Sequence, residues 1–479
     1  MSATTEPLLN ELSVDGRPTI SVGCPDVPFD SSDIPAGLLR DDLPLPEVGE
    51  PEVVRHFTRL SRLNVSIDTT FYPLGSCTMK YNPKVNDAMA ALPGMRAIHP
   101  LQPEATVQGA IQLTYEVQEL LARITGFDAV SLTPAAGAQG ELAGLLMIRA
   151  AHLARGDGRR RRVLIPDSAH GTNPATAAMA GYEVASLPSD ARGNVDLTAL
   201  RQLLGDDVAG LMITVPSTLG LFDEAMLEVS RLVHAAGGLV YGDGANLNAL
   251  LGIARLRDLG LDVMHSNLHK TFTTPHGGGG PGSSAIAATA ELAPFLPTPV
   301  AVRRDDGTYA LDDNRPESIG RMGGFHGHFG MLVRAYTYIR MLGTPGLREV
   351  SEAAVLNANY LRARLAERYR VAHDRTCMHE VVLSGLRQDG ARTLDVAKRL
   401  LDYGYHPPTI YFPLVVPEAM MVEPTETETK ATLDAFVAAM VAIADEAARD
   451  PELLRTAPHT TPVGRLDETT AARNPVLHW

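Results

Sequence analysis

The chain has 479 residues, 45% of them hydrophobic, which is enough to bury a large core and implies two domains or more. Its formal charge of −14 at pH 7 disfavours nucleic acid and anionic membrane surfaces as partners. No run approaches the ~20 apolar residues of a membrane span, and the N-terminus lacks the basic flank and apolar core of a signal peptide. The three cysteines, Cys24, Cys77 and Cys377, form no CxxC pair, which indicates reduced thiols and predicts neither a metal site nor a disulfide framework. The composition therefore favours a cytoplasmic enzyme.

The N-terminal region differs in composition from the rest of the chain. Residues 1–70 are rich in proline, aspartate and other polar residues and predict an irregular arm that carries one short amphipathic helix. Such an arm is typical of segments that wrap around another subunit, and the alternative is a disordered segment. Residues 71–330 predict a large α/β domain, and residues 331–479 predict a smaller C-terminal α+β domain with a tail.

Short apolar runs alternate with helical segments throughout the predicted large domain. The predicted strands are 129–132, 162–166, 183–187, 209–214, 238–242 and 262–267, with a further apolar run at 284–288. The helices between them include 140–154, 196–204 and 224–236. This alternation predicts an α/β fold with a mostly parallel seven-stranded sheet covered on both faces. From about residue 331 long amphipathic helices replace the alternation, and the last of them spans 430–447.

One lysine stands at the end of an apolar run. Residues 261–268 predict a strand that ends at His269 and Lys270, and small, hydroxylic and glycine-rich residues follow. A lysine that closes a buried strand is costly to bury unless it has chemistry to perform. Lysine serves as the Schiff-base residue for pyridoxal phosphate (PLP), and the glycines after it suit a phosphate site. The alternative is a surface lysine before a flexible loop.

Three upstream strand ends offer the other parts that PLP requires. Asp243 would pair with the pyridine nitrogen and keep it protonated, although an Asp before Gly is also a common turn former. His170 would stack on the cofactor ring, with a loop histidine satisfied by its neighbours as the alternative. The phosphate would bind where a helix opens, at the backbone N–H groups of Ala136, Gly137, Ala138 and Gln139.

A series of motifs extends this interpretation to most of the chain. The motifs are YPLGSCTMKYNPK (72–84), AAGAQGE (135–141), DSAHGTNPA (167–175), DGANLNA (243–249), NLHKTFTTPHGGGGPG (267–282), HPPTIYFPL (406–414) and EPTETETK (423–430). With these motifs the chain resembles the glycine dehydrogenase (decarboxylating) family, the P-proteins of the glycine cleavage system, and within it subunit 2 of the two-subunit bacterial form. Ser266 and Val215 depart from the expected pattern, and neither removes a catalytic part.

The resemblance implies the fold of the PLP-dependent enzymes of fold type I, with the active site between the two domains and near a subunit boundary. It implies PLP-dependent decarboxylation of glycine, release of CO2, and transfer of the aminomethyl group to the lipoyl arm of a small carrier, the H-protein. It also implies a companion P-protein subunit 1, and we expect two copies of each subunit.

The resemblance also assigns roles to individual residues. Lys270 would bind PLP, Asp243 and His170 would act as described above, and His269 is the closest candidate for proton transfer unless it only packs beside the lysine. Asn246 and Thr218 complete the predicted cofactor contacts, and Thr218 with Ser217 would also seat the substrate. Thr271 and the loop 277–280 are second candidates for the phosphate.

Two other classes of protein remain open from the sequence. The first is another PLP enzyme of the same fold, such as a cysteine desulfurase or an aldolase, for which Cys377 would be the candidate thiol. The second is a non-catalytic regulatory half, which would lack the lysine that this chain has.

Overall fold

The computed structural model describes residues 6–17, 26–28, 34–39, 45–276, 282–388 and 390–477. Residue contacts divide the chain into two compact units. One unit joins the N-terminal arm up to Thr70 with the C-terminal tail from Pro458, and the other spans Phe71–Ala457. Within the described ranges, no helix combines the length and the apolar character needed to cross a bilayer.

The longest helix of the first unit is α1 (Glu50–Arg62). Glutamates occupy its first turn and arginines its last, which is the arrangement that the helix dipole favours. The tail contributes the short helix α14 (Glu468–Arg473), whose N-terminus is capped by the side chain of Asp467.

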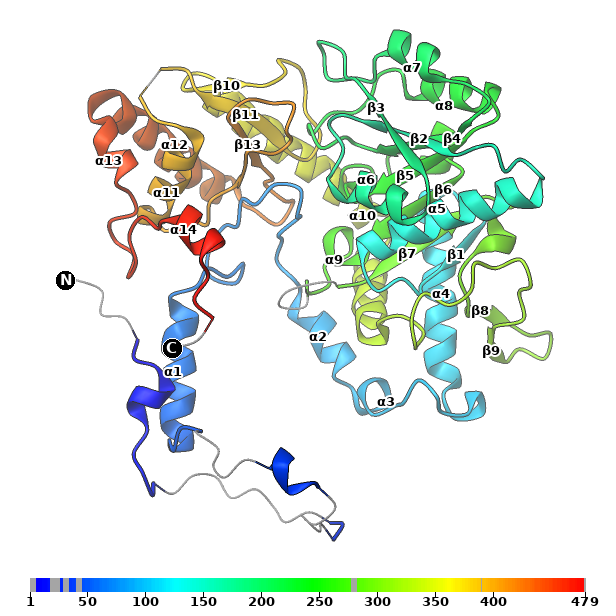
Figure 1. Ribbon diagram of the computed structural model, residues 1–479, viewed down its shortest axis with the longest axis horizontal. Helices are drawn as coiled ribbons and strands as arrows, with labels where there is room; N and C mark the ends of the chain where they lie inside the picture. The colour runs from blue at the N-terminus through cyan, green and yellow to red at the C-terminus, as the bar shows by residue number, and fades with distance from the viewer. Residues whose placement is uncertain are drawn as a thin grey trace. The chain divides into compact units, whose positions relative to one another are not determined.

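The second unit is built around a seven-stranded sheet (Figure 1) with the order β1-β7-β6-β5-β4-β2-β3. Its strands are β1 (Ala129–Ser131), β2 (Arg162–Pro166), β3 (Glu183–Leu187), β4 (Val208–Thr214), β5 (Leu239–Gly244), β6 (Val263–Asn267) and β7 (Ser284–Ala288). The β2–β3, β2–β4, β4–β5 and β5–β6 pairs are parallel, whereas β7 is antiparallel to both of its neighbours. The predicted mostly parallel seven-stranded sheet is confirmed.

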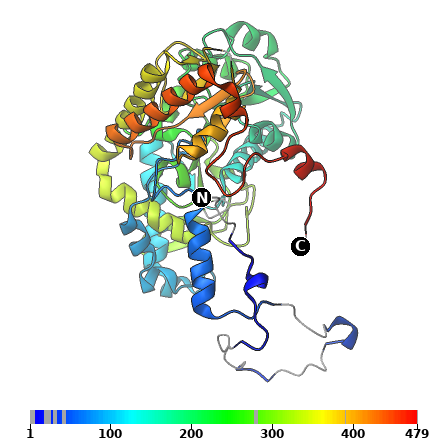
Figure 2. The ribbon, with the colours of Figure 1, turned by 90° about the vertical axis from the view of Figure 1, so that its left-hand side faces the viewer.

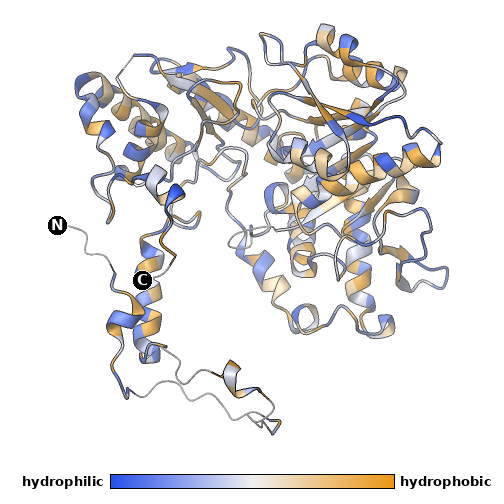
Figure 3. Cartoon of the chain, in the orientation of Figure 1, coloured by the Kyte–Doolittle hydropathy of each residue, from blue (hydrophilic) through white to orange (hydrophobic). Residues whose placement is uncertain are grey.

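Helices cover both faces of this sheet. They are α4 (Gln108–Thr125), α5 (Gly137–Ala154), α6 (Thr172–Met179), α7 (Leu197–Leu203), α8 (Met226–Ala235) and the first part of α10 (Phe329–Leu365). Alternate strand residues face opposite sides: Met264 belongs to the hydrophobic core that includes residues of α4, α7, α8 and α10, whereas Val263 belongs to the core that includes residues of α5 and α6. Figure 3 shows α5 as hydrophobic along most of its length, as expected for a helix buried against a sheet.

Short elements complete this part of the chain. They are α2 (Lys84–Ala90), α3 (Pro93–Arg96), α9 (Leu268–Thr271) and the hairpin of β8 (Val300–Arg303) with β9 (Tyr309–Asp312).

A second core lies around a four-stranded antiparallel sheet with the order β10-β11-β13-β12. Its strands are β10 (Tyr369–Val371), β11 (Val381–Leu386), β12 (Thr409–Ile410) and β13 (Ala419–Val422), and its helices are α11 (Thr393–Asp402), α12 (Lys430–Arg449) and α13 (Pro451–Arg455). Helix α12 runs beside the C-terminal half of α10 (Figure 2). Gly343 has φ 60° inside α10 and marks a kink between its two halves.

Candidate active site

The carboxyl ends of the parallel strands meet the start of α5 at a pocket of about 240 Å³. This edge of an open α/β sheet is where ligands bind. Most of the sequence-predicted site residues come together here, namely Ala136, Gly137, Ala138, His170, Thr218, Asp243, Asn246, His269 and Lys270. Gln139, Ser217 and Thr271 do not line this pocket. The predicted loop 277–280 lies outside the described residues.

Lys270 projects from a single helical turn and not from a strand. Strand β6 ends at Asn267, the end of the predicted strand 262–267, and Lys270 belongs to α9, which begins at Leu268. The Lys270 amine donates a hydrogen bond of 2.7 Å to the backbone carbonyl oxygen of Ser76. The GSCTMK part of the first motif therefore forms one wall of the lysine site.

Two buried glutamates hold the backbone of that wall. The carboxylate of Glu380 accepts from the N–H of Ser76 at 2.8 Å, and that of Glu423 accepts from the N–H and the hydroxyl of Thr78 at 2.8 and 2.7 Å. Ser76 and Thr78 have φ of 65° and 49°, a left-handed conformation that costs free energy in residues other than glycine. Burial raises the pKa of both glutamates, that of Glu380 well above its usual range.

These glutamates were missed by the sequence interpretation. Glu423 opens one of the quoted motifs, but Glu380 lies about 300 positions from the loop that it holds, and no local pattern connects the two.

Asp243 lies at the end of β5 and is 3% exposed. Its Oδ2 accepts from the side-chain amide of Asn173 at 3.0 Å, and its Oδ1 accepts from the N–H of Ala245 at 2.9 Å. Burial alone acts to raise the pKa of Asp243, but the charge of His265, these two donors and Lys270 hold it below its ordinary value. Asp243 is therefore a buried carboxylate that stays ionised.

His170 lies at the opening of the pocket and is exposed. Its Nδ1 lies 2.7 Å from the Thr172 hydroxyl, and its ring meets Phe412 edge to face at 5.6 Å between centroids. The hydroxyl of Thr172 in turn donates to Glu141 at 2.8 Å.

The start of α5 provides the predicted phosphate site. Its first backbone N–H groups have no partner within the helix. A Cβ on Gly137 would lie 2.7 Å from the side-chain nitrogen of Asn267, so a side chain at this position would collide with the pocket wall. The Gln139 side chain is engaged elsewhere: its Oε1 accepts from the N–H of Ala135, and its Nε2 donates to the carbonyl of Met322.

His269 lies beside Lys270 at the edge of the pocket. Its Nδ1 lies 3.0 Å from the carbonyl oxygen of Ser283, and His276 packs against its ring. Burial, with the charge of His276, lowers the pKa of His269 to about 3. With this lowered pKa the imidazole is neutral at physiological pH and is a weak base.

The other predicted residues have varied surroundings. Thr218 donates to the carbonyl of Ser168, and Asn246 donates to that of Pro216 at 3.0 Å. Thr271 is fully buried, and its carbonyl accepts from Lys80 at 2.9 Å. Ser217 lines a separate small cavity next to the pocket, together with Thr218.

The pocket fits a polar, anionic ligand such as PLP. Three of its buried oxygens lack a hydrogen-bond partner among the described residues, namely Thr214 Oγ1, Asn246 Oδ1 and Asn267 Oδ1. Unpaired buried polar atoms are costly and indicate that a ligand satisfies them. A lysine amine, an ionised aspartate and a helix N-terminus around one pocket match the aldehyde, pyridine nitrogen and phosphate of PLP.

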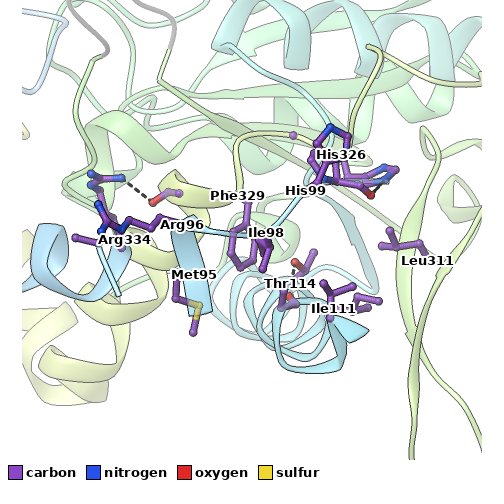
Figure 4. A pocket seen from close by; sticks show the side chains of 17 residues that line it. Met95, Arg96, Ile98, His99, Ile111, Thr114, Leu311, His326, Phe329 and Arg334 are labelled. Carbon is purple, nitrogen blue, oxygen red and sulfur yellow. Dashed lines mark hydrogen bonds between the residues drawn. The ribbon is translucent and has the colours of Figure 1, made fainter. Parts of the chain in front are cut away.

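A larger pocket of about 500 Å³ lies elsewhere in this unit (Figure 4). Apolar side chains such as Ile98, Ile111 and Phe329 line it together with Arg96 and His326. Neither Lys270 nor Asp243 lines it.

Comparisons with known proteins show which family the chain resembles. A family model described as "Glycine dehydrogenase, C-terminal domain" matches residues 350–459. The chain is 57% identical over 478 residues to the probable glycine dehydrogenase (decarboxylating) subunit 2 of Caldanaerobacter subterraneus subsp. tengcongensis, covering 98% of each chain. It is also 57% identical over 481 residues to the protein of the same description from Desulforamulus reducens, covering 99% of each chain.

Solved structures share the fold at lower identity. A crystal structure of glycine decarboxylase (P-protein) of the glycine cleavage system, in inhibitor-bound form, matches with a TM-score of 0.72 and 21% identity, covering 86% of this chain and 94% of that one. Lactobacillus brevis glutamate decarboxylase matches with a TM-score of 0.65 and 14% identity, covering 87% and 97%. The fold is therefore that of the PLP-dependent enzymes of fold type I. From its full-length similarity to the curated relatives, the chain belongs to the family of glycine dehydrogenase (decarboxylating) subunit 2.

Proposed function

We propose that this protein decarboxylates glycine with PLP and transfers the aminomethyl group to the lipoyl arm of an H-protein, as the P-protein of a glycine cleavage system. The observation that carries the proposal is the convergence of Lys270, Asp243 and the start of α5 on one pocket in a chain of this family. The two other classes are disfavoured, because the chain has the lysine and its relatives are glycine dehydrogenase subunits.

The residues around the pocket would divide the binding of PLP among them. Lys270 would hold it covalently, the N–H groups of Ala136, Gly137, Ala138 and Gln139 would bind its phosphate, and Asp243 would pair with its pyridine nitrogen. Thr271 and the loop 277–280 remain second candidates for the phosphate. When bound, PLP supplies an electron sink for the electron pair left at the glycine carbon as CO2 departs.

The chain's own groups then orient the reactants and move protons. Asp243, held ionised, would keep the proton on the pyridine nitrogen. His170 would stack on the ring and fix its plane, Asn246 and Thr218 would contact the cofactor, and Thr218 with Ser217 would position the substrate. His269 is the closest candidate for proton transfer near the lysine amine, and its lowered pKa makes it a weak base.

We further propose that the protein works in the cytoplasm in a complex with subunit 1, with two copies of each chain. The description of the relatives as subunit 2 supports a companion subunit. Closed two-fold symmetry is the commonest arrangement of oligomers and supports the composition of two plus two.

The test is exchange of labelled CO2 into the carboxyl group of glycine, with the lipoylated H-protein present. Four samples are compared: this chain alone, the companion alone, both together, and the companion with a Lys270→Ala chain. The proposal expects exchange only when the unmodified chain and the companion are combined. Full activity of the chain alone as a stable homodimer would contradict the assembly, and no glycine-dependent exchange in any sample would contradict the reaction.

A further inference from the structure

A line of buried polar side chains continues from Asp243 into the sheet. In the pairing of β5 with β6, Asp243 is directly opposite His265. Tyr241 precedes Asp243 by two residues on β5 and therefore points to the same face of the sheet. Tyr241, Asp243 and His265 are 0%, 3% and 1% exposed, so none of them reaches solvent.

Contacts connect Tyr241 to His265 and His265 to Asp243. The Tyr241 hydroxyl lies 2.6 Å from Nδ1 of His265, and Nε2 of His265 lies 3.5 Å from Oδ1 of Asp243. Burial and the nearby carboxylates raise the pKa of Tyr241 well above its usual value, so its hydroxyl keeps its proton. A hydroxyl that donates to Nδ1 leaves the ring proton on Nε2, the nitrogen that faces Asp243.

A second carboxylate adjoins the same histidine. Polar atoms of Glu141, Asp243 and His265 all lie within 4.8 Å of one another. Glu141 accepts from the hydroxyls of Thr172 and Thr176 at 2.8 and 3.1 Å. Because protein donors already satisfy both carboxylates and Tyr241 engages Nδ1, the cluster is a hydrogen-bonded network and not a vacant cation site.

Helix α5 is packed tightly against this network. A Cβ on Gly140 would lie 2.8 Å from the Cβ of His265, and one on Gly144 would lie 2.2 Å from the Tyr241 ring. These two glycines, four residues apart on one helix face, let the helix backbone approach both side chains. Their close approach keeps each ring in a single position.

We propose that Tyr241 and His265 form a positioning relay for Asp243, which orients the carboxylate and keeps it ionised toward the ring nitrogen of PLP. The inference rests on the proposed function for the identity of the cofactor. The charged and titratable groups around His265 are Asp243 and Tyr241 on β5, Glu141 on α5, and His269 and Lys270 beyond the end of β6. His265 lines the pocket beside Asp243, and its contact with that carboxylate gives it a positioning role.

The test compares His265→Leu, His265→Gln and Tyr241→Phe with the unmodified chain, each assembled with the companion subunit. Two quantities are measured: the ¹⁵N chemical shift of the ring nitrogen of labelled bound PLP across pH, and kcat with KM for glycine. Tyr369→Phe is the matched control, because it removes the hydroxyl of another buried tyrosine that bonds the carbonyl of Met440 in the smaller domain.

The relay predicts that His265→Leu still binds PLP at Lys270. The pyridine nitrogen of the bound PLP should lose its proton at a lower pH in this variant than in the unmodified protein. A fall of one unit in the pKa of the ring nitrogen lowers its protonated fraction by about tenfold at pH values above that pKa, and kcat should fall with that fraction while KM changes little. His265→Gln, whose amide can donate to Asp243, should recover part of the ring-nitrogen pKa. Tyr241→Phe should have a ring-nitrogen pKa between those of His265→Leu and the unmodified protein. Tyr369→Phe should match the unmodified protein. An unchanged ring-nitrogen titration in both His265→Leu and Tyr241→Phe would overturn the relay. Because this titration does not need glycine turnover, the relay can fail or stand separately from the proposed reaction.

Discussion

The surroundings of Asp243 favour the ionised form of its carboxylate. It is buried, yet two N–H donors and neighbouring positive charge keep its pKa below the ordinary value. Asp243→Asn should keep binding PLP but lose activity by about 100-fold or more, the size of a well-placed electrostatic contribution, because a neutral amide cannot hold the ring nitrogen protonated. Steady-state kinetics and the cofactor absorbance of the purified variant measure the two effects. A near-normal kcat in Asp243→Asn would indicate that Asp243 only forms a turn.

At the same scale, the sequence predicted the polar residues that face the pocket better than those that support them. Lys270, Asp243 and His170 each follow an apolar run, so their position at the sheet edge could be inferred. His265 and Tyr241 lie inside strands and resemble ordinary core residues in the sequence. Their contact depends on the register of β5 with β6, which no local pattern specifies.

At the scale of elements, the strands were predictable because both faces of the sheet are covered, and each strand is a short continuous apolar run. The predicted runs 162–166, 183–187 and 284–288 coincide with β2, β3 and β7. The predicted strand 262–267 ends where β6 ends, but the helical turn α9 that follows it was not predicted, since residues 268–272 are compatible with strand or helix. The left-handed loop at Ser76 was also hidden, because Glu380 and Glu423, which hold it, are far away in sequence.

The start of α5 gives a prediction at this scale. Gly137→Ala places a Cβ against the Asn267 amide at the first turn of the helix, where the phosphate is expected. We expect the Kd for PLP to rise by about tenfold or more, since a lost charge-assisted hydrogen bond is worth about 1.5–3 kcal/mol. Titration of the apoprotein with PLP measures the Kd. Gly109→Ala in the first turn of α4 is the control, because nothing lies within 4 Å of its Cβ position. Equal affinities of the two variants would show that the phosphate binds elsewhere.

For the whole molecule, the prediction concerns stability in acid. Burial lowers the pKa of both His269 and His379 to about 3. Their pKa in the unfolded chain is about 6.5, so below that pH the unfolded chain binds protons that the folded one excludes. Stability therefore falls as the pH drops from about 6.5 toward 3, by about 1.4 kcal/mol per histidine at pH 5.5.

Urea unfolding of the apoprotein at pH 7.5 and pH 5.5 measures this loss. His269→Asn should lose less stability between the two pH values than the unmodified protein. A variant of the exposed His99, His99→Asn, is the control, because it leaves His269 and its neighbours in place. If His269→Asn and the unmodified protein lost the same stability, the buried histidine would not be the cause.

The division of the chain into an arm of residues 1–70, a large domain of 71–330 and a small domain with tail of 331–479 stays a prediction. Residue contacts group the arm with the tail from Pro458 and join everything between them into one unit. Composition showed that the arm lacks apolar residues for a core of its own. It gave no indication that the last residues associate with it, because such pairing is a tertiary property.

The central claim is that this chain, and not its companion, carries the cofactor on Lys270. The most direct measurement is borohydride reduction of the purified two-subunit complex with PLP, followed by digestion and mass spectrometry of both chains. The account predicts a single pyridoxyl-modified lysine, Lys270 of this chain, and its loss in a Lys270→Ala complex, whereas replacing the exposed Lys430 leaves the modification in place. Modification of a different lysine, or of the companion chain, would contradict it.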